Sequence, residues 1–370
     1  MSRSARPTLG DAAFLAVLLF VAGAGCGSEA GEAASGGKAK PRIAFLLPES
    51  KTARYETQDR PHFEAKVKEL CPDCQVSYSN ASQDIANQHA QADAALANGA
   101  DVLVLDPVDS AAAAAVARNA KAAAVPVVSY DRLVLDVDVN YYVSFDNERV
   151  GELQARTLVD RLRAQGRPTG TIVMINGSPT DHNASLFKLG AHRAFDRSAV
   201  QVGAEYDTPD WSPDQAQREM EQAITKLGVA TIAGVYAAND GTAGGAIAAM
   251  KGAGFRELPP ITGQDAELAA VQRILAGEQY MTVYKAIRRE AEAAAILAVA
   301  LARGEEPPPG LVNGEVDNGK RRVPSVLLDP VPVTRENIRA TVVADGFWSA
   351  AQICTADLAA ACRSAGIDDR

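Results

Sequence analysis

Short runs of β-branched and aromatic residues alternate with longer amphipathic segments from Arg42 onward. Apolar runs this short indicate buried strands, whereas the longer segments have the periodicity of helices that cover a sheet. The predicted strands are 43–47, 76–78, 102–105, 127–129, 141–144, 172–175, 200–204, 232–236, 261–263, 281–283 and 323–328. The predicted helices include 63–70, 83–98, 111–124, 148–164, 213–227, 243–253 and 268–276. This alternation predicts an α/β fold with doubly wound parallel sheets.

The number of strands favours two α/β lobes. About ten strands are too many for one ordinary open sheet, and a barrel would need about eight. We assign residues 41–146 plus 284–318 to a first lobe and residues 147–283 plus 319–370 to a second lobe. The three crossings near 144–148, 281–284 and 310–322 would form a hinge. Since ligands bind beyond the carboxyl ends of parallel strands, we expect a site in the cleft between the lobes.

Charged, amide and aromatic side chains come after many of the predicted strands. The candidate ligand-binding residues are Arg54, Tyr55, Asp131, Arg132, Asp181, Asn183, Trp211, Asn239, Asp265 and Lys285. Carboxylates and guanidinium groups can each bridge adjacent hydroxyl groups of a sugar, and Trp211 and Tyr55 could cover its apolar face. We therefore expect a polyhydroxylated ring as the ligand. For a single residue such as Asp131 or Asp181, a helix cap or a surface loop remains the alternative.

Several of these strand-end segments resemble those of a known family. Residues 52–56, 128–133, 142–155, 177–184, 239–246, 263–266 and 281–285 resemble, in the same order, segments of the D-xylose-binding proteins of ABC transporters. That group belongs to the type I periplasmic binding proteins, which also include ribose and galactose receptors. The resemblance runs from about Arg42 to Trp348.

The resemblance implies a role for each candidate residue. Tyr55 and Trp211 would sandwich the sugar ring, and the other eight candidates would hydrogen-bond it. Tyr55 replaces a tryptophan of some relatives, and the loop around Arg54 is slightly longer here. The implied function is capture of a monosaccharide, D-xylose first, by hinge closure and its delivery to an ABC permease. A sensor feeding a chemoreceptor or kinase, or a receptor for another pentose or hexose, is the alternative.

The N-terminal residues predict export. Arg3 and Arg6 precede an apolar run at 12–22 that is too short to span a bilayer, so residues 1–25 are interpreted as a signal peptide. Small residues before Cys26 resemble a bacterial lipobox, which implies acylation of Cys26 and a membrane anchor, with a flexible tether at 26–40. The alternative is ordinary cleavage that leaves Cys26 free.

Four further cysteines are expected to form two local disulfides. Export favours disulfide bonds, and Cys71 lies close to Cys74 while Cys354 lies close to Cys362. A redox motif is the alternative for the first pair. Such motifs commonly use a helix N-terminus to lower the thiol pKa, whereas this pair comes after the predicted helix at 63–70.

Charge and missing motifs argue against other functions. The net charge of −9 without a basic cluster argues against nucleic-acid binding, and an export signal stands where a sugar-responsive repressor would carry its DNA-binding helices. The four histidines form no metal-binding motif, so we expect no metal and no cofactor. Cationic or amide neighbours of Asp131, Asp181 and Asp265 should keep these carboxylates ionised, unlike a general acid. We therefore expect a monomeric binding protein and no enzyme.

Overall fold

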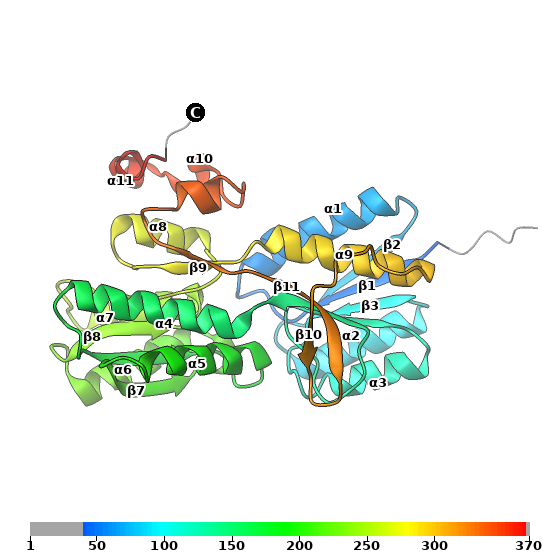
Figure 1. Ribbon diagram of the computed structural model, residues 1–370, viewed down its shortest axis with the longest axis horizontal. Helices are drawn as coiled ribbons and strands as arrows, with labels where there is room; N and C mark the ends of the chain where they lie inside the picture. The colour runs from blue at the N-terminus through cyan, green and yellow to red at the C-terminus, as the bar shows by residue number, and fades with distance from the viewer. Residues whose placement is uncertain (1–39, 368–370) are drawn as a thin grey trace, which may run out of the picture. The chain divides into compact units, whose positions relative to one another are not determined.

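Seven strands form the sheet of the first lobe in the computed structural model, which describes residues 40–367 (Figure 1). The strands are β1 (Arg42–Leu47), β2 (Gln75–Asn80), β3 (Val102–Leu105), β4 (Val127–Tyr130), β5 (Tyr141–Phe145), β10 (Gly314–Asp317) and β11 (Arg322–Leu328). Their order is β10-β11-β5-β4-β3-β1-β2, and all neighbours are parallel except the antiparallel pair β10 and β11. The sheet therefore confirms the predicted α/β class.

Helices cover both faces of this sheet because its strands are apolar on both sides. Helices α1 (Arg60–Leu70) and α9 (Ile287–Arg303) bury Phe63 and Leu297 against Phe45 on one face. Helices α2 (Ile85–Ala97) and α3 (Ala114–Ala122) cover Leu103 and Leu105 on the other. The π-helix η1 (Tyr55–Asp59) leads directly into α1.

The second lobe contains a smaller parallel sheet. Strands β6 (Thr171–Asn176), β7 (Gln201–Asp207) and β8 (Ile232–Ala237) have the order β7-β6-β8. The predicted strand at 261–263 contributes an isolated bridge from Ile261 to Val235. Helices α4 (Asn147–Ala164) and α5 (His182–Phe195) pack on one face, and α6 (Pro213–Leu227) and α7 (Asp240–Gly252) pack on the other.

The C-terminal segment packs on helix α8 (Leu268–Ala276). Strand β9 (Thr282–Tyr284) pairs antiparallel with β12 (Val331–Val333), and the chain continues through η3 (Arg339–Val343), α10 (Ala350–Ile353), η4 (Ala356–Leu358) and α11 (Ala359–Ser364). Ile353 and Cys362 join a core cluster with residues of α8. The structure contains both expected disulfides, Cys71–Cys74 after α1 and Cys354–Cys362 between α10 and α11.

The boundary that we predicted at residue 318 is wrong. Strand β11 pairs in parallel with β5, so residues 322–328 belong to the first sheet. The expected crossing at 310–322 is instead the β10–β11 hairpin, and the chain leaves the first sheet only between Leu328 and Val331. Burial of Val323 and Ser325 explains the difference, because an apolar strand covers the edge of β5.

The N-terminal predictions lie mostly outside the described residues. The signal peptide, Cys26 and the tether up to residue 39 are not described. Within residues 40–367, none of the helices combines the length and the apolar character that crossing a membrane would require.

Candidate functional site

One narrow cavity brings together side chains from both lobes. It is lined by Thr52, Arg54, Tyr55, Asp131, Arg132, Asp181, Asn183, Phe187, Trp211, Asn239, Gln264, Asp265 and Lys285. All ten candidates from the sequence are in this set. They come from η1 and its N-cap, the ends of β4 and β9, the starts of α5 and α7, the short 3-10 helix η2 (Pro209–Trp211), and the segment after the bridge from Gln264 to Val283.

Three lining residues were missed by the sequence analysis. Thr52 and Gln264 lie next to predicted residues in the same strand-end segments, so a wider reading of those segments would include them. Phe187 lies one helical turn after Asn183 on α5. A helix prediction at 182–195 would have placed these two side chains on one face, but this segment was not among the predicted helices.

Buried carboxylates fix the direction of the Arg54 guanidinium. Its Nε and Nη2 donate to Asp59 at 3.0 and 2.6 Å, and Nη2 also donates to Glu290 at 2.7 Å. The Tyr130 hydroxyl donates to Asp59 at 2.5 Å. Arg54 Nη1 has no hydrogen-bond partner and lies 3.4 Å from Asp131 Oδ2. Asp59 and Glu290 are fully buried, so this arrangement leaves one guanidinium nitrogen for the cavity.

Burial and charge oppose each other at Arg54. Burial alone would lower the pKa of Arg54, but the nearby carboxylates of Asp131, Asp59 and Glu290 raise it well above its usual value. The guanidinium therefore stays charged. Burial raises the pKa of Glu290 well above its usual range in spite of the opposing effect of Arg54.

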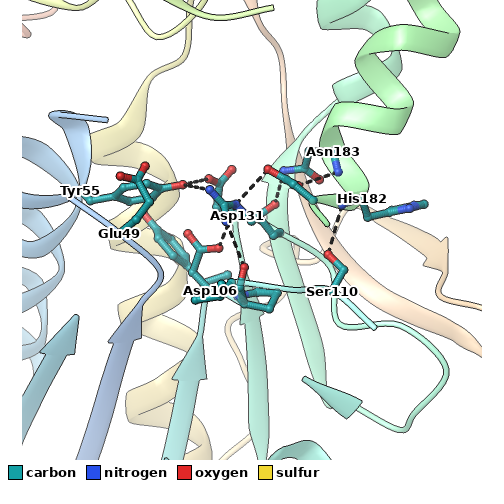
Figure 2. A network of polar contacts seen from close by, with 12 residues as sticks. Glu49, Tyr55, Asp106, Ser110, Asp131, His182 and Asn183 are labelled. Carbon is teal, nitrogen blue, oxygen red and sulfur yellow. Dashed lines mark hydrogen bonds and ion pairs between the residues drawn. The ribbon is translucent and has the colours of Figure 1, made fainter. Parts of the chain in front are cut away.

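Arg132 connects the two lobes next to Tyr55. Its Nε lies 3.0 Å from Asp181 Oδ2, and its Nη2 donates to the Tyr55 hydroxyl at 3.2 Å. Asp106 lies at 3.7 Å from the same Nε, is fully buried, and has no hydrogen-bond partner (Figure 2). Burial raises the pKa of Asp106 well above its usual value. Asp106 was not among the predicted residues, although it directly follows the predicted strand at 102–105 and the strand-end rule would have included it.

The aspartates of the cavity differ in their electrostatics. Burial would raise the pKa of Asp131, but Arg54, Lys285 and Arg132 outweigh it and hold the value below its usual range. Burial raises the pKa of Asp181, with Arg132 acting in the opposite direction. The lowered pKa agrees with the expectation that Asp131 stays ionised, whereas the pKa of Asp181 is shifted in the opposite direction. Asp265 forms an ion pair with Lys285 at 2.9 Å.

Asp181 is also a helix cap. Its Oδ1 accepts the backbone N–H of Asn183 at 2.8 Å at the start of α5, and its Oδ2 accepts the Trp211 Nε1–H at 3.1 Å. The capping alternative is therefore correct for this residue and is compatible with its place in the cavity. His182 is the first residue of α5, and burial lowers the pKa of its imidazole.

The lobes contact each other directly beside the cavity (Figure 2). The backbone N–H of Ser110 donates to the Thr180 carbonyl at 3.0 Å, and the His182 N–H donates to Ser110 Oγ at 3.2 Å. The Asn183 side-chain amide donates to the Asp131 carbonyl at 2.9 Å. Residues that line the cavity and residues outside it therefore both hold the two lobes together.

Left-handed backbone conformations recur at this site. Asp131, Asp210, Trp211 and Asp265 have φ values of 51, 56, 54 and 91°. Residues other than glycine rarely adopt this region, and such strain concentrates at functional sites. In the part of the chain that the structure describes, no group of three or more side chains is arranged to hold a metal ion.

Comparison with known proteins gives consistent matches. Residues 43–306 match the family model described as the periplasmic binding protein domain. The chain is 37% identical to the D-xylose-binding periplasmic protein of Escherichia coli (strain K12), over 84% of this chain and 92% of that protein. It is 32% identical to the multiple sugar-binding periplasmic protein SbpA of Azospirillum brasilense, over 85% of this chain and 91% of that protein.

Solved structures show the same architecture. An ABC transporter solute-binding protein from Clostridium phytofermentans, with bound β-D-glucose, has a TM-score of 0.77 at 28% identity, covering 84% of this chain and 99% of its own. A carbohydrate transporter solute-binding protein from Chloroflexus aurantiacus, in complex with D-glucose, has a TM-score of 0.75 at 31% identity, covering 85% and 98%.

Proposed function

Because this chain belongs to the periplasmic binding protein family and has its type I fold, we propose that it captures a monosaccharide and delivers it to an ABC permease. The observation that carries this proposal is the cavity in which all ten strand-end candidates meet. The family relationship and the sugar-binding relatives support the transport role. The protein would act as a monomer, without a cofactor.

The charges of the cavity favour an uncharged, hydroxyl-rich ligand. Three cationic side chains and three carboxylates line it, so the formal charges balance; they are Arg54, Arg132, Lys285, Asp131, Asp181 and Asp265. Two buried atoms of this set, Arg54 Nη1 and Asp131 Oδ1, have no hydrogen-bond partner. Sugar hydroxyl groups can both donate to carboxylates and accept from a guanidinium, which would satisfy these atoms.

D-Xylose is the first candidate among the sugars. Relatives from Escherichia coli and Haemophilus influenzae, 37 and 36% identical, are named for D-xylose. Trp211 and Tyr55 line the cavity and would cover the two faces of the ring. The glucose complexes of the related structures make a hexose the alternative ligand.

Hinge closure would couple binding to transport. A ligand favours the closed state only if it binds that state more tightly, which requires contacts from both lobes. Arg54 and Arg132 come from the first lobe, and Asn183, Trp211 and Asn239 come from the second. The crossings between β5 and α4, between β9 and α9, and between β11 and β12 would serve as the hinge.

The carboxylates support binding rather than hydrolysis. Asp131 has a lowered pKa beside Arg54, whereas a general acid needs a raised one. Asp181, whose pKa is raised, is occupied by Arg132, Trp211 and the N-terminus of α5. We therefore propose that the protein is not an enzyme. Turnover of a xyloside would contradict this assignment.

Calorimetric titration with D-xylose, ribose, arabinose, glucose and galactose tests the function. We expect saturable binding, with xylose the tightest. Trp211→Ala and Asp265→Ala should abolish binding and the ligand-induced thermal shift without changing the far-UV circular dichroism. Asp160→Ala, an exposed position on α4, is the matched control. Retained affinity in both site variants would show that the site is wrong, and a wild type that binds none of these sugars would contradict the function.

We also propose that the protein is exported and anchored through Cys26. Cleavage after residue 25 would leave Cys26 for acylation and residues 26–40 as a tether. Cys26→Ser should move the protein from the detergent phase to the aqueous phase and abolish its labelling by a fatty acid. Equal partitioning of the variant and the wild type would exclude the anchor.

A further inference from the structure

Gly177 has no side chain at the place that the Trp211 ring occupies. A Cβ atom built on Gly177 would lie 2.5 Å from Trp211 Cζ3 and closer still to Cζ2 and Cη2, all under the 3.0 Å that real Cβ atoms keep. Gly177 is absent from the glycines with a left-handed backbone. Space, and not conformational freedom, therefore explains a glycine directly after β6.

The indole is held from several other directions. Its Nε1–H donates to Asp181 at 3.1 Å, and its ring meets Phe187 edge-on at 6.3 Å between centroids. The left-handed backbone of Asp210 and Trp211 delivers the side chain, and the Asp210 N–H donates to Ser178 Oγ at 3.3 Å. Both Trp211 and Phe187 line the cavity, and Gly177 is not among its lining residues. The indole therefore separates Gly177 from the ligand space.

We propose that Gly177 is a specificity-determining residue. Because Gly177 has no side chain, the Trp211 ring can occupy the space beside it, and this position of the ring sets the size of the cavity. This inference rests on the proposed sugar binding. A methyl group at position 177 would overlap the indole, and the ring would shift toward the cavity that it lines. The loss of space affects a hexose more than a pentose, which lacks the additional hydroxymethyl group. Gly177 thus limits the bulk of the sugar without touching it.

The first experiment compares Gly177→Ala with Gly252→Ala. A Cβ at Gly252 meets no atom within 4 Å, so this control should keep the wild-type affinity. We expect Gly177→Ala to weaken D-xylose binding about tenfold and D-glucose binding by a larger factor, within the range for one methyl group in a pocket. An unchanged ratio of the two dissociation constants would overturn the proposal. A wild type that binds neither sugar would instead overturn the proposed function.

The second experiment tracks the ring itself and does not depend on sugar. The Trp348→Phe background removes the other tryptophan, so the emission comes from Trp211 alone. In this background, Gly177→Ala should shift the emission maximum. The smaller ring in Gly177→Ala/Trp211→Phe should restore the melting temperature to that of Trp211→Phe alone. If Gly177→Ala leaves the emission unchanged, or if the double variant melts well below Trp211→Phe, the steric relationship is wrong.

Discussion

Two carboxyl groups near the cavity, those of the fully buried Asp240 and the half-buried Glu267, make the stability of the protein depend on pH. Burial raises the pKa of Asp240 to about 7 and that of Glu267 to about 8. The Asp240 carboxylate accepts the Glu267 N–H, the Gln279 amide and the Thr282 hydroxyl, so it ties the start of α7 to α8 and β9. Arg273 acts in the opposite direction on both carboxyl groups.

These raised pKa values predict that the unliganded protein becomes more stable from pH 9 to pH 7. A carboxyl group with a raised folded-state pKa binds a proton in the folded protein before the unfolded chain does, so stability rises as the pH falls through that value. The pKa values of His62 and His182 are lowered, so these imidazoles change the stability only below about pH 6.5, outside this window. Urea unfolding at pH 7, 8 and 9 measures the effect.

Glu267→Gln should reduce this dependence on pH. Gln removes the titrating group, and no hydrogen bond of the Glu267 carboxylate is lost with it among the contacts described. Glu257→Gln, at an exposed position, is the control. The difference between the two variants in the pH dependence of the unfolding free energy measures the effect of burial. A stability that falls from pH 9 to pH 7, or an equal slope in both variants, would contradict the assignment.

At the residue scale, the sequence predicts the side chains at strand ends and misses the residues that support them from distant segments. Asp131 and Asp265 could be predicted because each comes directly after a strand or bridge that ends at the cavity. Glu290, which orients Arg54, is separated from it by 236 positions and lies inside α9. No local pattern connects two such residues, since only the packing of α9 on the first sheet brings them together.

Helices α4 and α5 cross with their backbones in contact, which positions the second-lobe side of the site. A Cβ on Gly190 would lie 2.9 Å from the Glu148 carbonyl carbon and closer to its oxygen. A Cβ on Gly151 would lie 2.6 Å from the Phe187 carbonyl carbon, again closer to the oxygen. The two glycines therefore set the distance between the helices, and α5 presents Asn183 and Phe187 to the cavity.

Gly190→Ala should therefore affect both stability and binding. The neighbouring atoms are backbone atoms that cannot rotate away, so we expect a loss of about 1–3 kcal/mol in the free energy of unfolding. Displacement of α5 should also weaken sugar binding. Urea unfolding and calorimetric titration measure the two effects, with Gly252→Ala as the control. If Gly190→Ala has the same free energy of unfolding as the wild type, the close approach of α4 and α5 does not contribute to stability.

At the element scale, periodicity is a better guide than composition. The predicted range 213–227 coincides with α6, and the predicted range 268–276 coincides with α8. Residues 310–322 were interpreted as an interlobe crossing because they are rich in Gly, Asn and Lys. A hairpin turn and a linker use the same residue types, so only strand pairing distinguishes them.

In the whole molecule, the contact of Ser110 with residues 180–182 joins the lobes outside the cavity. The hydrogen bonds between Ser110 and residues 180–182 exist only while the lobes lie together, so they stabilise the closed arrangement. Ser110→Ala removes the bond from the His182 N–H. At about 1 kcal/mol for one hydrogen bond, the affinity for sugar should fall about fivefold.

Stopped-flow measurements can assign this loss to the closed state. We expect Ser110→Ala to accelerate sugar dissociation and to leave association nearly unchanged, because the contact forms after the sugar has entered. Ser77→Ala, at an exposed position on β2, is the matched control. A slower association with an unchanged dissociation rate would mean that Ser110 acts before closure.

The pairing of β11 with β5 has a consequence for how the protein is made. The sheet of the second lobe and the helices that cover it lie between these two strands in the chain, so the edge of β5 stays unpaired until residues 322–328 have been synthesised. The sheet of the second lobe, in contrast, is built from one continuous stretch. An exposed strand edge invites pairing with other chains, and distant contacts form slowly. A nascent or truncated chain that ends before β11 is thus the form most exposed to aggregation, and secretion before folding would delay that risk until the last strand is present.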